Sequence, residues 1–233
     1  MLAAGIPARS AVPSATDTLS PIWHPSPNFG ARRDGLTPSL IVLHYTAMTS
    51  AQAALERLCD PAYEVSAHYL IGRDGTLWQM VREEDRAWHA GAGEWHGQSD
   101  INSRSIGIEL DNTGFHPFPE PQLMILEALL RQISERWSIA PENVIGHSDM
   151  APGRKSDPGP RFPWQRLEHL RLAGQRNHSV PPDVQMDAFR SLAQSAGYTA
   201  EADDDTLLTA VRLRYRPWGK GSLQPADLAP LAK

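Results

Sequence analysis

The chain has 233 residues, with 22 basic and 27 acidic side chains and a formal net charge of −5. Since no basic stripe stands out, the charge pattern of nucleic-acid-binding proteins is missing, and we expect no nucleic-acid partner. The one cysteine, Cys59, excludes an intrachain disulfide framework and any cysteine-rich metal site. The longest apolar runs fall far short of the ~20 residues of a membrane-spanning helix, so none is predicted.

The N-terminal part of the chain is rich in proline. Residues 1–38 contain six prolines and little periodicity, which predicts an extended segment rather than a domain. The first residues lack the basic start and long apolar stretch of a signal peptide, which favours a cytoplasmic location. An apolar run at 39–44 then predicts a buried strand. Residues 49–59 predict a helix whose N-cap is Thr49 or Ser50.

A hairpin and a further strand are predicted next. Two strand-like runs, 67–72 and 76–81, flank Asp74-Gly75, a pair that adopts positive φ at low cost and so indicates a tight turn. Residues 105–110 alternate between apolar and other side chains, which is typical of a strand.

A long helix and a short strand complete the sheet domain. Residues 120–137 place apolar side chains at 3-4-3-4 spacing, which predicts an amphipathic helix. A short strand is predicted at 143–147 and a last helix within 163–172. This alternation predicts an α/β (α+β) domain over 39–172, with a central mixed sheet flanked by helices.

The rest of the chain divides into a linker, 173–182, and a small helical module, 183–233. Two helices are expected in the module, at 184–196 and 205–215. About fifty residues are few for independent stability, so we expect the module to dock on the main domain.

Two histidines stand at the ends of predicted strands, His44 and His147. Such strand ends can meet at one edge of a sheet, where ligands gather, although a lone histidine is more often simply hydrogen-bonded. The segment that follows His147 is stiffened by four prolines and carries Asp149, Lys155 and Asp157. A rigid loop beside a buried strand holds polar groups in place, whereas charges in an ordinary loop are merely solvated.

Two histidines and a carboxylate suit Zn²⁺, which takes three protein ligands at catalytic sites and leaves a fourth position for water. Asp149 and Asp157 are both candidates for the carboxylate, and spacing does not choose between them. Glu109 lies opposite the apolar face of its strand and could accept a proton if its side borders the site. Lys155 could reach a developing oxyanion.

Five segments of the chain occur in the order of a known enzyme family. They are LHYTAM (43–48), VSAHYLIGRDGTLWQMV (65–81), RAWHAG (86–91), NSRSIGIELDN (102–112) and GHSDMAPGRKSDPGP (146–160). In this combination they resemble the zinc-dependent N-acetylmuramoyl-L-alanine amidases of the AmpD/AmiD group. That group shares its fold with peptidoglycan recognition proteins and T7-type lysozyme amidases.

The resemblance implies a role for each matching residue. His44, His147 and Asp157 correspond to the ligands of one Zn²⁺ per chain, which selects Asp157 over Asp149. Glu109 and Lys155 correspond to the catalytic acidic residue and the catalytic lysine.

Four further positions follow from the same motifs. Some members carry a catalytic tyrosine where this chain has Ala67, which makes Glu109 the stronger candidate for the base. Arg73, Trp88 and His89 correspond to the groove that binds substrate.

The activity implied is hydrolysis of the amide between the lactyl group of N-acetylmuramic acid and L-alanine, in peptidoglycan or muropeptides, during cell-wall turnover or recycling. One alternative is a non-catalytic peptidoglycan-binding protein, against which the retained ligands argue. Another is a zinc hydrolase of a different amide. We expect a monomer whose partner is peptidoglycan or a muropeptide.

The C-terminal module resembles the one that follows the amidase domain in the AmiD branch, where such modules are called peptidoglycan-binding. Its presence favours the periplasm or cell envelope as the alternative location. Because every candidate site residue lies between 44 and 157, we expect residues 1–172 to suffice for cleaving small muropeptides.

Overall fold

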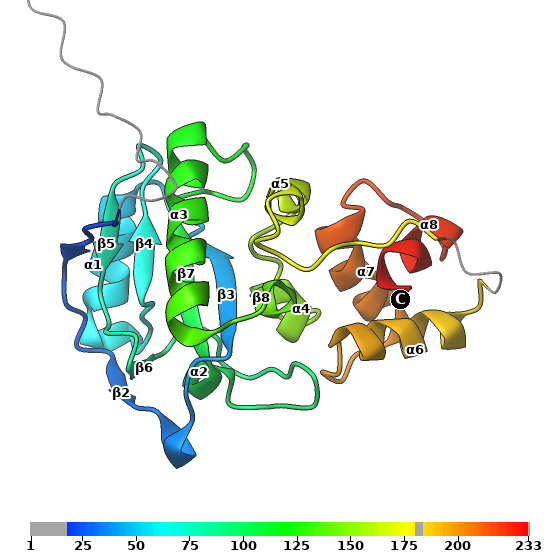
Figure 1. Cartoon of the computed structure of the whole chain (residues 1–233), viewed down its shortest axis with the longest axis horizontal. Helices are drawn as coiled ribbons and strands as arrows, with labels where there is room; N and C mark the ends of the chain where they lie inside the picture. The colour runs from blue at the N-terminus through cyan, green and yellow to red at the C-terminus, as the bar shows by residue number, and fades with distance from the viewer. Residues whose placement is uncertain (1–17, 180–183, 233) are drawn as a thin grey trace, which may run out of the picture.

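The structure is a computed structural model that describes residues 18–179 and 184–232. A six-stranded sheet lies at its centre (Figure 1). Its strands are β1 (Ile22–Trp23), β3 (Leu40–Tyr45), β4 (Tyr69–Ile71), β5 (Leu77–Gln79), β7 (Ser105–Leu110) and β8 (Val144–Gly146). Their order is β1-β5-β4-β7-β3-β8. β4 and β5 are antiparallel, as the predicted hairpin requires, and the other neighbours are parallel. The predicted mixed sheet is thereby confirmed.

One face of the sheet is covered by α3 (Glu120–Trp137) and α5 (Trp164–His169). The apolar stripe of α3 packs on alternate residues of β3 and β7, which confirms the amphipathic helix. The core of this layer includes Ile41, Leu43, Ile106, Ile108, Leu110, Leu123, Leu126, Leu130, Ile133 and Leu167. These strand residues have odd numbers in β3 and even numbers in β7, so His44 and Glu109 are left for the opposite face.

The opposite face is covered in two places. The helix α1 (Ala51–Cys59) begins at its cap Ser50, whose Oγ accepts a hydrogen bond from Ala53 N, and packs on β4. At the other end of the sheet, α4 (His147–Met150) and the C-terminal helices cover β3 and β8. The surface left between these two layers contains the ends of β3 and β7.

The C-terminal helices are α6 (Met186–Ala196), α7 (Asp204–Tyr215) and α8 (Pro225–Leu228), followed by the 3-10 turn η4 (Ala229–Leu231). They form one cluster beside β8 and α4 in Figure 1. Their buried side chains share a core with the sheet domain. That core includes Val42, Ile145, Met150, Phe189, Ala193, Tyr198, Leu207 and Val211. The module therefore docks on the main domain, as its size led us to expect.

Several short elements did not show in the sequence pattern, because two to four residues carry no periodicity. They are β2 (Phe29–Ala31), β6 (Asp85–Ala87), α2 (Ile101–Arg104), η1 (Arg33–Gly35), η2 (Pro61–Tyr63) and η3 (Pro141–Asn143). β2 pairs with β6 and β1 with β5, so the proline-rich segment adds strands from residue 22 onward. The predicted strand 143–147 ends at Gly146, and His147 begins α4 instead.

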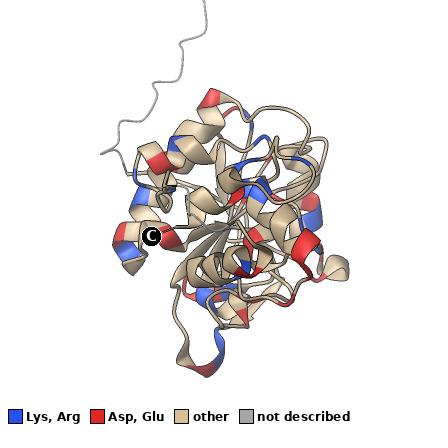
Figure 2. Ribbon diagram, turned by 90° about the vertical axis from the view of Figure 1, so that its right-hand side faces the viewer, with Lys and Arg blue, Asp and Glu red and all other residues tan. Residues whose placement is uncertain are grey.

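The division of the chain into four segments stays a prediction. Residues 1–17 of the first segment and 180–182 of the linker lie outside the described residues. Within the described part, no helix is both long and apolar enough to cross a bilayer. Basic and acidic positions are interspersed over the ribbon in Figure 2.

Candidate active site

The sheet brings three of the predicted site residues to one edge. His44 and Glu109 are register partners in the parallel strands β3 and β7, so their side chains leave the same face. β8 pairs with β3 on its other side, and His147 follows immediately after β8. His44 is therefore flanked by Glu109 on one side and His147 on the other.

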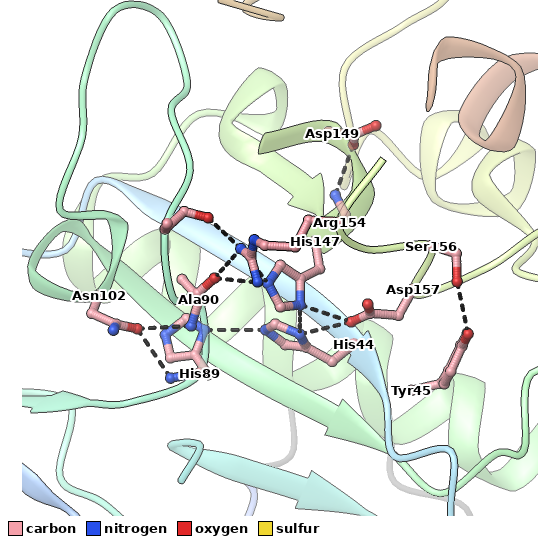
Figure 3. A network of polar contacts seen from close by, with 12 residues as sticks. His44, Tyr45, His89, Ala90, Asn102, His147, Asp149, Arg154, Ser156 and Asp157 are labelled. Atoms are coloured by element: carbon pink, nitrogen blue, oxygen red, sulfur yellow. Dashed lines mark hydrogen bonds and ion pairs between the residues drawn. The ribbon is translucent and has the colours of Figure 1, made fainter. Parts of the chain in front are cut away.

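Three ligand-type atoms converge at this edge (Figure 3). His44 Nδ1 lies 2.9 Å from His147 Nδ1 and 2.8 Å from Asp157 Oδ2, and His147 Nδ1 lies 3.1 Å from Asp157 Oδ2. Tetrahedral neighbours with zinc–ligand bonds of about 2.0–2.2 Å are separated by roughly 3.4 Å. All three residues are buried. The cluster could hold a metal ion.

The hydrogen bonds of His147 show which of its nitrogens is free for a ligand. Its Nε2 lies 2.8 Å from the carbonyl oxygen of Ala90, which can only accept a hydrogen bond. The proton of a neutral imidazole is thereby assigned to Nε2. Nδ1 then presents its lone pair to His44 and Asp157.

A chain of donors gives His44 the same tautomer. Ser105 Oγ donates to Ile101 O (2.6 Å), so it accepts from His89 Nε2 (3.2 Å). His89 Nδ1 then accepts from His44 Nε2 at 3.1 Å, which leaves His44 Nδ1 unprotonated. Burial and the nearby His147 lower the pKa of His44 to about 4, so its ring is neutral at neutral pH.

The face of β7 that borders the site leaves room for this series of hydrogen bonds. Ser105, Gly107 and Glu109 alternate along it, opposite the apolar side chains that meet α3. A Cβ at Gly107 would lie 2.5 Å from His89 Cγ, so the glycine makes room for the imidazole. Asn102 Oδ1 accepts from the backbone nitrogens of His89 (3.0 Å) and Ala90 (2.8 Å) and holds this turn in place.

Glu109 is half-buried, and its Oε2 atom is buried without a hydrogen-bond partner among the described residues. Burial, with the charge of Asp157 as a second cause, raises its pKa to about 8. A carboxyl group with its pKa raised toward neutrality can take up and release a proton at physiological pH. Because Glu109 is not one of the three clustered ligand residues, it is available for proton transfer.

A cavity of about 440 Å³ opens over the cluster. Seven of the predicted site residues line it: His44, Trp88, His89, Glu109, His147, Lys155 and Asp157. Arg73 is not among the lining residues, because it pairs with Asp111 at 3.2 Å and donates to Thr49 O. Its role in substrate binding stays a prediction.

Two groups that support the site, Ser105 and Arg154, were not predicted as site residues from the sequence. Ser105 could have been found, because it shares the strand alternation that singled out Glu109. Arg154 donates to the carbonyl oxygens of Ala90 (2.7 Å) and Ala92 and so brings a fixed cation to the cavity. That contact spans more than sixty residues of chain and leaves no local pattern.

A sequence profile of the family described as N-acetylmuramoyl-L-alanine amidase matches residues 34–160 of this chain. All the residues that line the cavity fall within that stretch. The chain belongs to the N-acetylmuramoyl-L-alanine amidases.

The amidase has similar relatives in enteric bacteria. It is 34% identical to the N-acetylmuramoyl-L-alanine amidase AmiD of Escherichia coli over 212 residues, which cover 76% of this chain and 75% of AmiD. It is 36% identical over 163 residues to the 1,6-anhydro-N-acetylmuramyl-L-alanine amidase AmpD of the same organism, covering 63% of this chain and 89% of AmpD.

Solved amidase structures share the fold. AmiD in complex with anhydro-N-acetylmuramic acid-L-Ala-D-gamma-Glu-L-Lys gives a TM-score of 0.76 at 31% identity, covering 83% of this amidase and 87% of that chain. AmpDh3 of Pseudomonas aeruginosa, in complex with anhydromuramic pentapeptide, gives 0.72 at 32% identity, covering 83% and 89%. Another AmpDh3 structure gives 0.75 at 29% identity over 96% of both chains, which takes in the C-terminal helices as well.

Proposed function

We propose that this amidase uses one Zn²⁺ per chain to hydrolyse the amide between the lactyl group of N-acetylmuramic acid and L-alanine in anhydromuropeptides. The observation that carries this function is the convergence of His44 Nδ1, His147 Nδ1 and Asp157 Oδ2 below the cavity that Glu109 lines. The complexes of AmiD and AmpDh3 with anhydromuramyl peptides support the substrate class.

The donor set fits Zn²⁺. Two neutral imidazoles and one carboxylate are a common three-ligand set of catalytic zinc, and each imidazole is oriented through its other nitrogen, by Ala90 O and by His89. When bound there, Zn²⁺ supplies Lewis-acid polarisation of the carbonyl and acidifies a water molecule.

The protein's own groups then move the proton and stabilise charge. Glu109 accepts the proton of the attacking water at its unpaired carboxylate oxygen and passes it to the leaving nitrogen of L-alanine. Lys155 lines the cavity, and its ammonium group stabilises the oxygen that becomes negatively charged. Trp88 offers an apolar wall to the sugar or lactyl group, and His89 acts through His44.

The test combines metal content with product analysis. We expect the purified protein to carry about one zinc per chain, to lose activity with a chelator and to regain it with added zinc. Mass spectrometry of anhydromuropeptide digests should show the stem peptide with a free L-alanine amino group and the sugar with a free lactyl carboxylate. The His147→Ala variant is the control, because it should retain neither zinc nor activity.

Two results would contradict this function. Zinc-loaded protein that binds muropeptides and leaves them intact would be a peptidoglycan-binding protein. Equal turnover of simple N-acyl-alanine amides, which lack the sugar, would indicate a zinc hydrolase of other amides.

Substrate preference also bears on location. We assign the amidase to the cytoplasm as a monomer, in recycling of anhydromuropeptides. Faster release of stem peptide from intact sacculi than from anhydromuropeptides would instead favour the periplasm or cell envelope. Fractionation of cells and the mass of the purified protein in solution test the location and the oligomeric state.

A further inference from the structure

Asp149 lies two residues after His147 and is completely buried. Its carboxylate accepts three hydrogen bonds. Gly146 N (2.7 Å) and an Arg214 terminal nitrogen (2.8 Å) donate to Oδ2, and Tyr198 OH (2.8 Å) donates to Oδ1. Only Gly146 is local. The other two donors come from the C-terminal helical region, 49 and 65 residues further along the chain.

Arg214 makes the main polar contacts between the C-terminal helices and the sheet domain. It is 4% exposed, and its guanidinium lies 4.1 Å over the ring of Trp164. Besides pairing with Asp149, it donates to Val144 O at 3.3 Å. Arg214 therefore contacts the chain both before and after His147, at Val144 in β8 and at Asp149 in α4. Removing one partner of a buried ion pair leaves the other charge uncompensated, so loss of either Arg214 or Asp149 should destabilise the protein.

A second contact joins α7 to the loop that leads to Asp157. Gly153 has a φ of 72°, and a Cβ there would lie 2.8 Å from Thr206 Cγ2. The backbone of this loop thus runs directly against α7. Ser148 N also donates to Asp157 O at 2.9 Å, so a backbone hydrogen bond joins the turn of His147 to the segment of Asp157.

We propose that the C-terminal helices are part of the amidase centre, with Arg214 and Tyr198 as positioning residues that hold His147 through Asp149. Groups behind the ligands of a metal fix ligand orientation and tune affinity. This role rests on the proposed function, because it presupposes a metal ion on His44, His147 and Asp157. It is separate from any binding of peptidoglycan by the module.

The experiment uses the full chain with Tyr198→Phe, Arg214→Met and Arg214→Lys. The matched control is Arg212→Met on the same helix, because Arg212 is also buried and pairs with Asp227 at 2.7 Å within the module. Zinc affinity is measured by competition with a chromogenic chelator. The visible absorption of the Co²⁺-substituted protein reports the geometry of the ligands, and kcat and KM are measured at saturating zinc.

We expect Arg214→Met to weaken zinc binding by about 10–100-fold, the usual effect of removing such a group, and Tyr198→Phe to weaken it less. Both should change the Co²⁺ spectrum and lower kcat with little change in KM. Arg214→Lys should recover part of the affinity, because its ammonium can still meet Asp149. Arg212→Met should match the wild type in affinity and spectrum even where it lowers the melting temperature.

Tyr198→Phe removes one hydroxyl from a packed ring, so it keeps the inference testable if Arg214→Met does not fold. Wild-type affinity and spectrum in Tyr198→Phe and in the folded Arg214 variants would overturn the positioning role and leave the proposed function intact. Equal losses in Arg212→Met and Arg214→Met would overturn it too, since the helices would then act only on stability. A wild-type protein that binds no metal would overturn both.

Discussion

At the scale of single residues, Glu109 lowers the stability of the folded protein in a way that suits it to proton transfer. Its neighbour in β7, Leu110, is buried against α3, whereas Glu109 lines the cavity with its Oε2 buried and unpaired among the described residues. A buried carboxylate is costly, and that cost raises its pKa to about 8. The same environment makes it suited to accept and return a proton.

Replacing Glu109 separates proton transfer from metal binding. Glu109→Gln keeps the shape of the side chain but cannot accept a proton, so kcat should fall by about 10²–10⁴-fold with little change in KM. Zinc content should stay that of the wild type, because Glu109 is outside the ligand cluster. Steady-state kinetics and metal analysis measure the two effects. Loss of zinc in this variant would mean that Glu109 is a ligand.

The same substitution predicts a pH-dependent gain in stability. Between pH 4.5 and about 8, folded metal-free protein keeps a proton on Glu109 that the unfolded chain has released. The free energy of unfolding of the wild type therefore falls as pH rises through this window. Glu109→Gln lacks this loss, so its stability relative to the wild type should increase over the window and then level off.

Chemical denaturation of both proteins in the presence of chelator, at several pH values, measures this difference. The other titrating groups are common to the two proteins and cancel. A difference in stability that does not change with pH would show that Glu109 has an ordinary pKa in the folded protein.

At the scale of elements, the two faces of β7 have different roles, because successive side chains point to opposite faces of the sheet. Its even-numbered residues pack on α3, and its odd-numbered residues supply a hydroxyl group, a space and a carboxyl group to the site. Since Gly107 has no side chain, His89 can sit against the sheet and reach His44.

A methyl group at position 107 should disturb the metal cluster from a distance. In Gly107→Ala, the new Cβ would displace the His89 ring and break its contact with His44, so zinc affinity should fall. Overpacking should also lower the free energy of unfolding by about 1–3 kcal/mol. Gly30→Ala is the matched control, because nothing lies within 4 Å of a Cβ there. Chelator competition and thermal unfolding test both variants. Unchanged zinc affinity in Gly107→Ala would show that His89 does not orient His44.

At the scale of the whole molecule, the module and the sheet domain share one core. Leu40, Val42 and Met150 pack with Phe189 and Leu208. The sequence led us to expect that residues 1–172 suffice, because the site residues all precede the linker. The shared core and the Arg214–Asp149 pair lead to a different prediction.

Truncation after residue 172 should therefore lower both stability and zinc affinity. It exposes the apolar side of α4 and removes Arg214 and Tyr198, two of the donors that hold the Asp149 carboxylate. Thermal unfolding, zinc content and turnover of a soluble muropeptide compare the truncated and full chains. A truncated chain with full zinc content and full turnover would restore the expectation from sequence.

The fold class and the principal helices and strands follow from the sequence, because burial repeats every second residue in strands and every third or fourth in helices. The site residues were assigned through the resemblance to a known family, and seven of the eight assigned residues line the cavity. The alternation of residues 105–110 placed Glu109 away from the α3 face, where the structure has it.

The way these residues are held depends on contacts between segments that are far apart in the sequence. The tautomer of His44 depends on His89, 45 residues away along the chain, and that of His147 depends on Ala90 O, 57 residues away. Asp149 receives Arg214 from a helix that the sequence assigned to a separate module. These contacts join distant segments through single hydrogen bonds, so they leave no periodicity in the chain, and only folding brings their partners together.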